Sequence, residues 1–240
     1  MAGAEELKLL GAVSGVSLYA IRVQMALAIK GLSYAHLPLE VGQRRSDLLA
    51  VYNPVHKKVP VLLHAGRPVC ESLVIVEYLD DVFPEGKGHV TVLPKDPHAR
   101  AVARFWAAFI DGTLFPSLIG MLKRKAPEER EEMVEATLRA LGLLEGALDS
   151  AEGEGTPFFG GAAVGLVDIA LGCYLPWLEA FGRLALPLLD AARMPRLAAW
   201  AERFRAAEPV GALLPAADKV EEYVTKVLCP KWNAVAAASN

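Results

Sequence analysis

The sequence has 240 residues, enough for about 1.6 domains of ordinary size. Its 53% apolar and 22% charged residues exclude an intrinsically disordered chain, and the net charge of −3 argues against a general binder of nucleic acids or anionic membranes. The longest charge-free runs, residues 9–21 and 155–167, hold 13 residues each, fewer than the roughly 18 that a transmembrane helix needs. Glu5 and Glu6 near the start are not typical of a secretory signal, so we expect a soluble, cytoplasmic protein.

The apolar runs and turn residues of the first third predict a mixture of strands and helices. In chain order they are a strand at 7–12, a helix at 19–30, a strand at 34–39, a short helical turn at 46–51, strands at 59–64 and 67–70, and a helix at 73–82. Gly31 is expected just after the first helix and Ser72 as the N-cap of the last. A helix between the first two strands implies a parallel pair, and the hairpin at Ala65-Gly66 adds an antiparallel strand. The result is a four-stranded mixed sheet.

A linker then separates this part from a helical one. Residues 83–97, FPEGKGHVTVLPKDP, are rich in proline and glycine, which break regular structure. The periodicity beyond the linker predicts helices at 100–121, 128–148, 168–181, 194–207 and 219–228, with a kink in the third at Pro176. We therefore predict an N-terminal domain over 1–84, a linker over 85–96 and an all-helical domain over 97–240.

Three loops of the first part carry chemistry. Ser17 opens the first helix, where its hydroxyl would either cap the helix or face an anion held at the helix N-terminus; Ser14 is a competing candidate. Pro60, in the run NPVHKKVPVL, is either an edge-strand proline or the second residue of a cis peptide bond. Glu71 and Ser72 open another helix, where helix capping is the simpler interpretation; they would also suit the ammonium and carboxylate of an α-amino-acid group.

Metal and disulfide chemistry receive no support from the sequence. Neither the cysteines nor the histidines share a spacing that suggests a disulfide framework, a metal site or a catalytic triad; they are Cys70, Cys173, Cys229, His36, His56, His64, His89 and His98.

The motifs KGLSY, NPVHKKVPVL, CES, ARFW and GLVDIALG closely resemble those of the tau class of glutathione S-transferases, a plant class, and the resemblance covers nearly the whole chain. It implies an α/β plus all-α fold, with a thioredoxin-like N-terminal domain followed by an all-helical C-terminal domain. It also implies a cytoplasmic homodimer that conjugates glutathione, as co-substrate and without a cofactor, to hydrophobic electrophiles in detoxification and stress responses. Reduction of peroxides stays open as a side activity.

The resemblance also assigns roles to residues. Ser17 matches the catalytic serine, and the glutathione-binding positions are Ser17, Arg45, Lys58, Val59, Glu71 and Ser72, with Pro60 as a cis-proline. The electrophile-binding positions are Tyr19, Phe115, Ile119, Leu122, Trp177, Tyr223 and Val227; for these, ordinary core packing is the alternative. Asp168 in GLVD matches a structural aspartate.

The chain departs from the family pattern around the catalytic serine. Leu18 and Tyr19 replace a proline and a phenylalanine, the loop after Gly11 is two residues longer, and a tryptophan is missing there.

Two functions of other kinds compete with the transferase. A non-catalytic carrier of glutathione conjugates or flavonoid-like ligands would keep the glutathione site and lack turnover. A pure interaction protein would not need Lys58, Pro60, Glu71 and Ser72 together. A thiol–disulfide enzyme is disfavoured because it would carry cysteine in place of Ser17.

Overall fold

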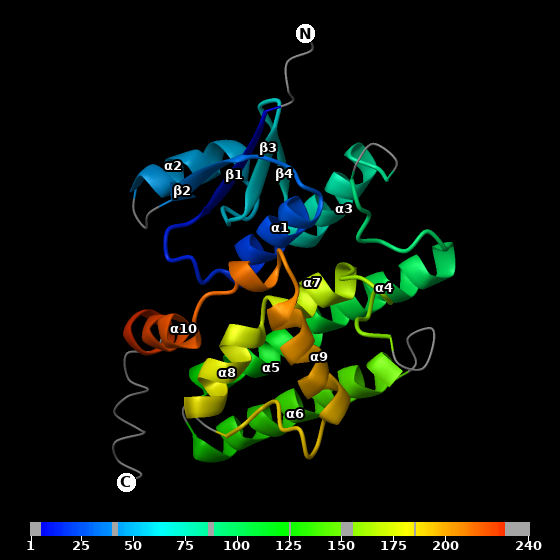
Figure 1. The fold of residues 1–240 in the computed structure, drawn as a ribbon. Coiled ribbons are helices and arrows are strands. Elements are labelled where there is room, and N and C mark those ends of the chain that lie inside the picture. Colours follow the sequence, from blue (N-terminus) through cyan, green and yellow to red (C-terminus); the bar gives the residue numbers. More distant parts are fainter. Residues whose placement is uncertain are drawn as a thin grey trace. The chain divides into compact units, whose positions relative to one another are not determined.

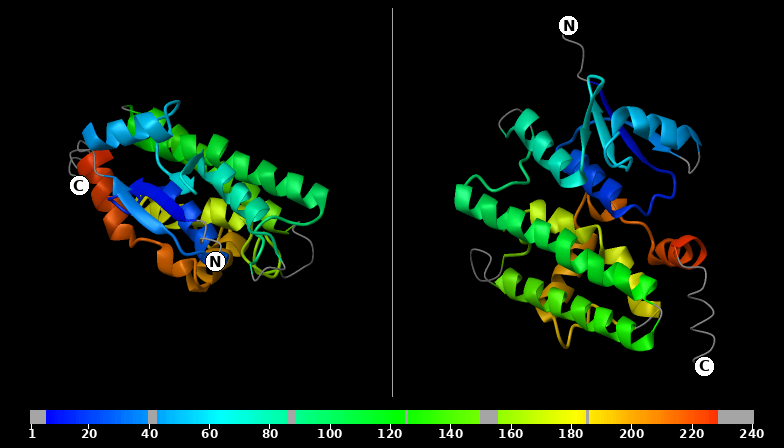
Figure 2. Two further views of the ribbon diagram at one scale, coloured as in Figure 1. Left: turned by 90° about the horizontal axis from the view of Figure 1, so that it is seen from above. Right: turned by 180° about the vertical axis from the view of Figure 1, so that it is seen from behind.

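The computed structural model describes residues 6–39, 43–85, 89–124, 126–149, 156–184 and 186–228. Contacts divide the chain into two compact units. The N-terminal unit comprises the residues up to Leu93 together with Glu208–Leu213, and the C-terminal unit comprises Pro94–Ala207 and the residues from Leu214 onward. Figures 1 and 2 show a sheet with helices in the first unit and helices alone in the second.

The sheet of the N-terminal unit has four strands in the order β2-β1-β3-β4. β1 (Leu7–Ala12) pairs parallel with β2 (Ala35–Leu39) and antiparallel with β3 (Val61–His64), and β3 pairs antiparallel with β4 (Arg67–Cys70). The predicted topology is therefore confirmed, including the hairpin at Ala65-Gly66.

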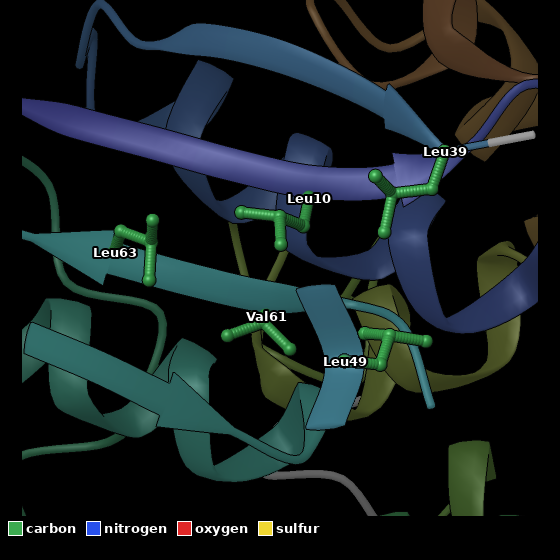
Figure 3. Packing of buried hydrophobic residues seen from close by; sticks show 5 residues of the cluster. All are labelled: Leu10, Leu39, Leu49, Val61 and Leu63. Carbon is green, nitrogen blue, oxygen red and sulfur yellow. The ribbon is translucent and has the colours of Figure 1, made fainter. Parts of the chain in front are cut away.

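Helices cover both faces of this sheet. α2 (Gln43–Tyr52) packs on the face to which alternate strand residues contribute apolar side chains, and Figure 3 shows that cluster: Leu10, Leu39, Leu49, Val61 and Leu63. The pleat turns Leu9 and Leu62 to the opposite face, where both are fully buried. On that side α1 (Leu18–Ile29) packs against α3 (Ser72–Val82).

Two predictions in this unit need correction. The segment expected as a short helical turn at 46–51 forms the longer helix α2. This helix is stabilised by the packing of Leu49 on the sheet, and its weak apolar periodicity does not reveal that contact. Ser72 is the first helical residue of α3 and not its N-cap. Glu71 occupies the cap position with a φ of 69°, and its carbonyl oxygen accepts the bond from Ile75 N at 2.8 Å.

A buried ion pair stabilises the contact between this unit and the segment that follows α3. Lys30 Nζ lies 2.7 Å from Asp80 Oδ1, with 0% and 6% of the two side chains exposed. Lys30 also donates to the carbonyl oxygens of Phe83 and Val90, at 3.0 and 2.8 Å. Asp80 in turn accepts from Leu93 N at 2.8 Å. Both charges of this buried pair are thus matched by an opposite charge and by further hydrogen bonds.

The described part of the C-terminal unit is helical (Figure 1). Its elements are α4 (Pro97–Phe109), the π-helical turn η1 (Ile110–Leu114), α5 (Phe115–Lys123), α6 (Pro127–Asp149), α7 (Leu166–Gly172), α8 (Leu175–Leu184), α9 (Pro195–Ala206), α10 (Ala217–Tyr223) and the π-helical turn η3 (Val224–Leu228). The short 3₁₀ helix η2 (Gly211–Leu213) belongs to the N-terminal unit, where it contacts α1.

Here one of the predicted helices is divided, and two others contain a π-helical turn. The helix expected at 168–181 is α7 and α8, because the chain turns at Cys173 and Tyr174 and Pro176 lies in the first turn of the new helix, where its missing N–H costs nothing. The predicted kink is therefore a break. In the helices expected at 100–121 and 219–228 the chain stays helical throughout, with the π-helical turns η1 and η3 inside them.

The stretch Pro97–Lys123 is the one segment of the described chain that is long and apolar enough to cross a membrane by length and composition, and 39% of its most apolar window is buried inside the protein. It comprises α4, η1 and α5, which pack against α6 and α7. Because it contains Arg100, Arg104 and Asp111, it has no charge-free run of 18 residues. Its buried residues, which include Ala107, Ile110, Leu114, Leu118 and Met121, belong to the core of the helical unit.

Candidate functional site

The strand pairing brings three loop ends to one edge of the sheet. Leu10 near the end of β1 faces Val61 at the start of β3, and Val61 faces Cys70 at the end of β4. The segments that follow β1, precede β3 and follow β4 therefore leave the sheet at the same edge. These segments carry Ser17, Lys58 with Val59, and Glu71 with Ser72.

Ser17 is the N-cap of α1. Its Oγ accepts a hydrogen bond from Ala20 N at 3.4 Å, and its backbone is extended. The side chain is half-buried. Because the oxygen is the acceptor in this bond, the hydroxyl proton stays available for donation to another group. Ser14 lies in the preceding turn and is also half-buried.

Glu71 and Ser72 form the entrance to α3. Glu71 is exposed, and its φ of 69° is rare for a residue other than glycine; strained backbone of this kind concentrates at functional sites. Ser72 is buried, and its Oγ accepts from Arg22 Nη1 at 2.9 Å. As in Ser17, the hydroxyl proton is left for a further acceptor.

The loop between α2 and β3 carries Lys58, which is exposed, and the half-buried Val59. The Val59–Pro60 peptide bond is cis, as one of the two sequence interpretations expected. Arg45 belongs to α2, but its side chain lies outside the described residues.

The structure adds side chains that the sequence analysis did not select. Arg22 is fully buried and joins α1 to Ser72, and its guanidinium lies 5.4 Å from the ring centre of Tyr19. The buried Asn53 accepts from His56 N at 3.1 Å and donates to the Lys58 carbonyl at 3.0 Å, so it shapes the loop. The Asn53-Pro54 dipeptide, which is typical of a turn, was the sequence signal that could have indicated the role of Asn53.

A free thiol lies next to this edge. Cys70 is half-buried, and its Sγ lies 3.4 Å from the Tyr52 carbonyl oxygen, to which it donates. Burial, and secondly the negative charge of Glu71, raise the pKa of the Cys70 thiol. It therefore stays protonated at neutral pH and is a poor nucleophile.

Most of the residues predicted to bind the electrophile lie in the C-terminal unit. Trp177, 5% exposed, meets the half-buried Tyr223 edge to face, with ring centres 6.2 Å apart. Phe115 packs on Tyr174 in the same way, at 6.2 Å.

The remaining residues of this set fall on helical faces or in the other unit. Ile119 and Leu122 follow Phe115 at helical spacing, and both are half-buried. Val227 is 60% exposed, four residues beyond Tyr223. Tyr19 belongs to the N-terminal unit.

Asp168 organises the turn before α7, as expected from its motif. Its carboxylate accepts from the backbone N–H groups of Phe159, Gly160 and Gly165 at 2.8–2.9 Å and from Trp200 Nε1 at 2.7 Å. Complete burial raises the pKa of the Asp168 carboxyl, and these donors oppose that effect. The residue serves the fold.

Metal binding finds no geometric support in the described part of the chain, where no three His, Cys, Asp or Glu side chains are grouped to hold an ion.

Two family models match the chain. "Glutathione S-transferase, N-terminal domain" matches residues 5–81, and "Glutathione S-transferase, C-terminal domain" matches residues 127–224. A probable glutathione S-transferase, GSTU6 of Oryza sativa subsp. japonica, is 50% identical over 98% of this chain and 98% of its own. Glutathione S-transferase U17 of Arabidopsis thaliana is 41% identical over 92% of this chain and 96% of its own.

Solved structures agree with the sequence relatives. The tau-class glutathione S-transferase of mango, Mangifera indica, superimposes with a TM-score of 0.85 at 39% identity, covering 92% of this chain and 97% of its own. The rice GST1 (OsGSTU1) in complex with glutathione gives a TM-score of 0.80 at 38% identity, covering 92% of this chain and 96% of its own.

The chain belongs to the plant tau class of glutathione S-transferases. The class predicted from the motifs is thereby confirmed, and so are the fold and the assignment as a transferase that conjugates glutathione.

Proposed function

We propose that this transferase activates glutathione at the edge of the sheet defined by Ser17, Val59 and Glu71, and joins its sulfur to hydrophobic electrophilic small molecules. It would act in the cytoplasm as a homodimer, in detoxification. Glu71 and Ser72 would hold the γ-glutamyl end, and Lys58 with Arg45 the glycyl carboxylate. Val59 would contact the backbone of the tripeptide.

The observation that carries this proposal is the placement of two helix N-termini at one edge of one sheet, each opening with a serine. A helix N-terminus favours negative charge through its unpaired N–H groups and its dipole. Of the three negative groups of ionised glutathione, the γ-glutamyl carboxylate and the thiolate would lie at these two helix N-termini. The exposed carboxylate of Glu71 beside the start of α3 complements the ammonium of the same γ-glutamyl group.

The chemical step needs a thiolate. A free thiol of pKa near 8.5 is only about 3% ionised at pH 7. The Ser17 hydroxyl, which already accepts from Ala20 N, would donate its proton in a hydrogen bond to the sulfur and stabilise the anion. The thiolate attacks the electrophilic carbon, a C–S bond forms, the leaving group departs with the electron pair, and the thiol proton passes to solvent.

The acceptor would contact the aromatic and aliphatic side chains of the C-terminal unit. Phe115, Trp177 and Tyr223 offer ring faces and edges, and Ile119, Leu122 and Val227 offer aliphatic surface. None of these six residues is Asp, Glu, His, Lys or Arg, so apolar acceptors suit them best. Tyr19, which lies in the N-terminal unit, is the seventh residue that the family resemblance assigns to electrophile binding.

A binding assay combined with turnover tests this function. The purified chain should be retained on immobilised glutathione, eluted by free glutathione, and should conjugate glutathione to members of a panel of hydrophobic electrophiles; organic peroxides in the panel report the side activity. Retention without turnover on any acceptor would favour the carrier. Absence of both would contradict a glutathione site at this edge.

A further inference from the structure

The helix α10 carries Tyr223 of the proposed acceptor surface and has few determinants of its own position. It has seven residues, its cap residue Ala216 lacks a side-chain acceptor, and the π-helical turn η3 follows it. Among the described elements other than η3, α8 is the one against which α10 packs extensively (Figure 1). The placement of Tyr223 therefore depends on the contact between α8 and α10.

Aromatic side chains join the two helices at one end of this contact. Tyr223, the last residue of α10, meets Trp177 in the first turn of α8 with ring centres 6.2 Å apart and ring planes at 74°. Edge-to-face pairs form over centroid separations of roughly 4.5–7 Å, so this contact alone allows the tyrosine ring to shift.

An ionic contact joins the same two helices at the other end. Arg183 lies in the last turn of α8, and its Nη1 donates to the carboxylate of Asp218 in the first turn of α10. The same nitrogen lies 3.7 Å from Glu221 Oε2. Arg183 follows Trp177 on α8, whereas Asp218 precedes Tyr223 on α10, so the two helices run antiparallel. The two spans, about 9 Å and about 8 Å of helix, nearly match.

The Arg183 guanidinium is also held from its own side. Its Nη2 donates to Glu179 Oε1 at 2.7 Å, one turn earlier on α8. Arg205 Nη2 of α9 donates to the other oxygen of Glu179 at 3.0 Å. The cation that reaches α10 is therefore ordered by α8 and α9, which lowers the entropy cost of its contact with Asp218. Networks of this kind are the case in which exposed ion pairs contribute measurably.

We propose that Arg183 is a positioning residue for the electrophile: it holds the first turn of α10 against α8 and so keeps Tyr223 on Trp177. This inference rests on the acceptor surface of the proposed function. Loss of Arg183 should widen the range of positions that Tyr223 takes and weaken the binding of an aromatic acceptor. The proposed glutathione site belongs to the N-terminal unit and should not be affected.

Two glutathione conjugates test this role without turnover, S-benzylglutathione and S-methylglutathione. They share the tripeptide and differ in the aromatic ring, so the ratio of their dissociation constants measures the contribution of the acceptor surface. In calorimetric titrations Arg183→Gln should weaken S-benzylglutathione about two- to fivefold, the effect of an exposed ion-pair network, and leave S-methylglutathione unchanged. Arg183→Lys, which keeps the charge, should recover most of the loss.

Salt should act in the same direction as the substitution. Raising the ionic strength from about 0.1 M to about 1 M shortens the screening length from roughly 10 Å to roughly 3 Å. The advantage of the unchanged chain over Arg183→Gln in binding S-benzylglutathione should therefore shrink. Effects of salt on apolar binding itself are common to both proteins and cancel in the comparison.

A double-mutant cycle determines whether Arg183 acts through Tyr223. Tyr223→Ala removes the ring, and adding Arg183→Gln to it should cause no further loss of affinity for S-benzylglutathione. Arg139→Gln, which breaks an exposed ion pair with Glu135 on α6, is the matched control and should leave both affinities unchanged. Thermal unfolding followed by circular dichroism verifies that each variant folds.

An unchanged ratio of the two dissociation constants in Arg183→Gln would overturn the positioning role. So would an equal loss for both conjugates, or the same loss with and without the Tyr223 ring. An unchanged ratio in Tyr223→Ala would instead contradict the proposed acceptor surface, and failure of the unchanged chain to bind either conjugate would contradict the proposed glutathione site. Either of these two results would remove the basis of the inference as well.

Discussion

Ser17 is the residue on which the proposed chemistry depends most. Ser17→Ala should lower kcat/KM for conjugation by about 10- to 150-fold, the effect of losing one hydrogen bond to a charged sulfur worth roughly 1.5–3 kcal/mol. The pH–rate profile should move to higher pH, toward the free-thiol pKa of about 8.5. The reason is that the lost hydrogen bond stabilises the thiolate and not the protonated thiol. Folding should survive the loss of a cap worth about 1 kcal/mol.

Ser14→Ala is the matched variant for this measurement, since both serines are half-buried and precede α1. It should leave the profile unchanged. A shift in Ser14→Ala alone would mean that the lengthened loop brings the other hydroxyl to the sulfur.

Glu71 and Ser72 should act on binding rather than on the chemical step. Glu71→Gln and Ser72→Ala should each raise the KM for glutathione about 10-fold or more, because each removes a charge-assisted contact of roughly 1.5–3 kcal/mol. Steady-state kinetics with glutathione as the varied substrate measures this. Ser72→Ala also deprives the buried Arg22 of an acceptor, so its unfolding curve should be recorded alongside. An unchanged KM in both variants would place the γ-glutamyl group elsewhere.

Cys70 gives a pH-dependent prediction with a definite sign. Burial is the larger cause that raises its pKa, and the charge of Glu71 is the smaller one. Alkylation of Cys70 by iodoacetamide should therefore be slow at neutral pH, and it should accelerate at a higher pH than alkylation of an ordinary cysteine does. Glu71→Gln removes the second cause, lowers the pKa and should speed labelling at a fixed pH. Peptide mapping by mass spectrometry reads Cys70 separately, and Asp81→Asn, an exposed position on α3, is the control.

At the scale of elements, the ion pair between Lys30, the C-cap of α1, and Asp80 of α3 should contribute strongly to the stability of the N-terminal unit. Lys30→Met leaves Asp80 charged and buried without its partner and should cost about 3–5 kcal/mol in urea unfolding. The double variant Lys30→Met/Asp80→Asn should recover part of that loss because the stranded charge is gone. Glu135→Gln, in an exposed pair on α6, should leave the unfolding midpoint unchanged. A double variant as unstable as the single one would show that the lost hydrogen bonds matter more than the charge.

How far elements can be predicted from the sequence depends on whether their determinants are local. Gly31, with a φ of 64°, ends α1 as expected, and the Ala65-Gly66 hairpin has both turn residues at positive φ, because these signals reside in one or two residues. The break at Cys173–Tyr174 was missed. At Gly172 an added Cβ would lie 2.1 Å from the Phe204 ring, so this region is shaped by the approach of α9, which no local pattern reports.

The candidate site follows the same rule: its contiguous motifs were predictable, and its residues with distant partners were not. The motif around Pro60 and the pair Glu71-Ser72 are contiguous in sequence, and the family resemblance assigned them. Arg22 and Asn53 act through partners that only folding brings close, 50 residues away in the case of Arg22 and Ser72. Ser72 was expected as a cap because its type fits, and the positive φ of Glu71 decided otherwise.

For the whole molecule, the family resemblance predicts a homodimer. Light scattering after size-exclusion chromatography at micromolar concentration should give about twice the chain mass of 25.8 kDa. A mass near that of one chain would contradict the prediction.

The short segment Glu208–Leu213 has a consequence for building chimeras of this transferase. The chain leaves the N-terminal unit once at Leu93 and returns to it with η2, which packs on α1. Exchanging helical units between relatives at a single junction in the linker would therefore graft a foreign η2 onto the native α1. Crossovers placed at both ends of 208–213 would keep each N-terminal unit with its own return segment, so recombination of acceptor specificity calls for three junctions and not one.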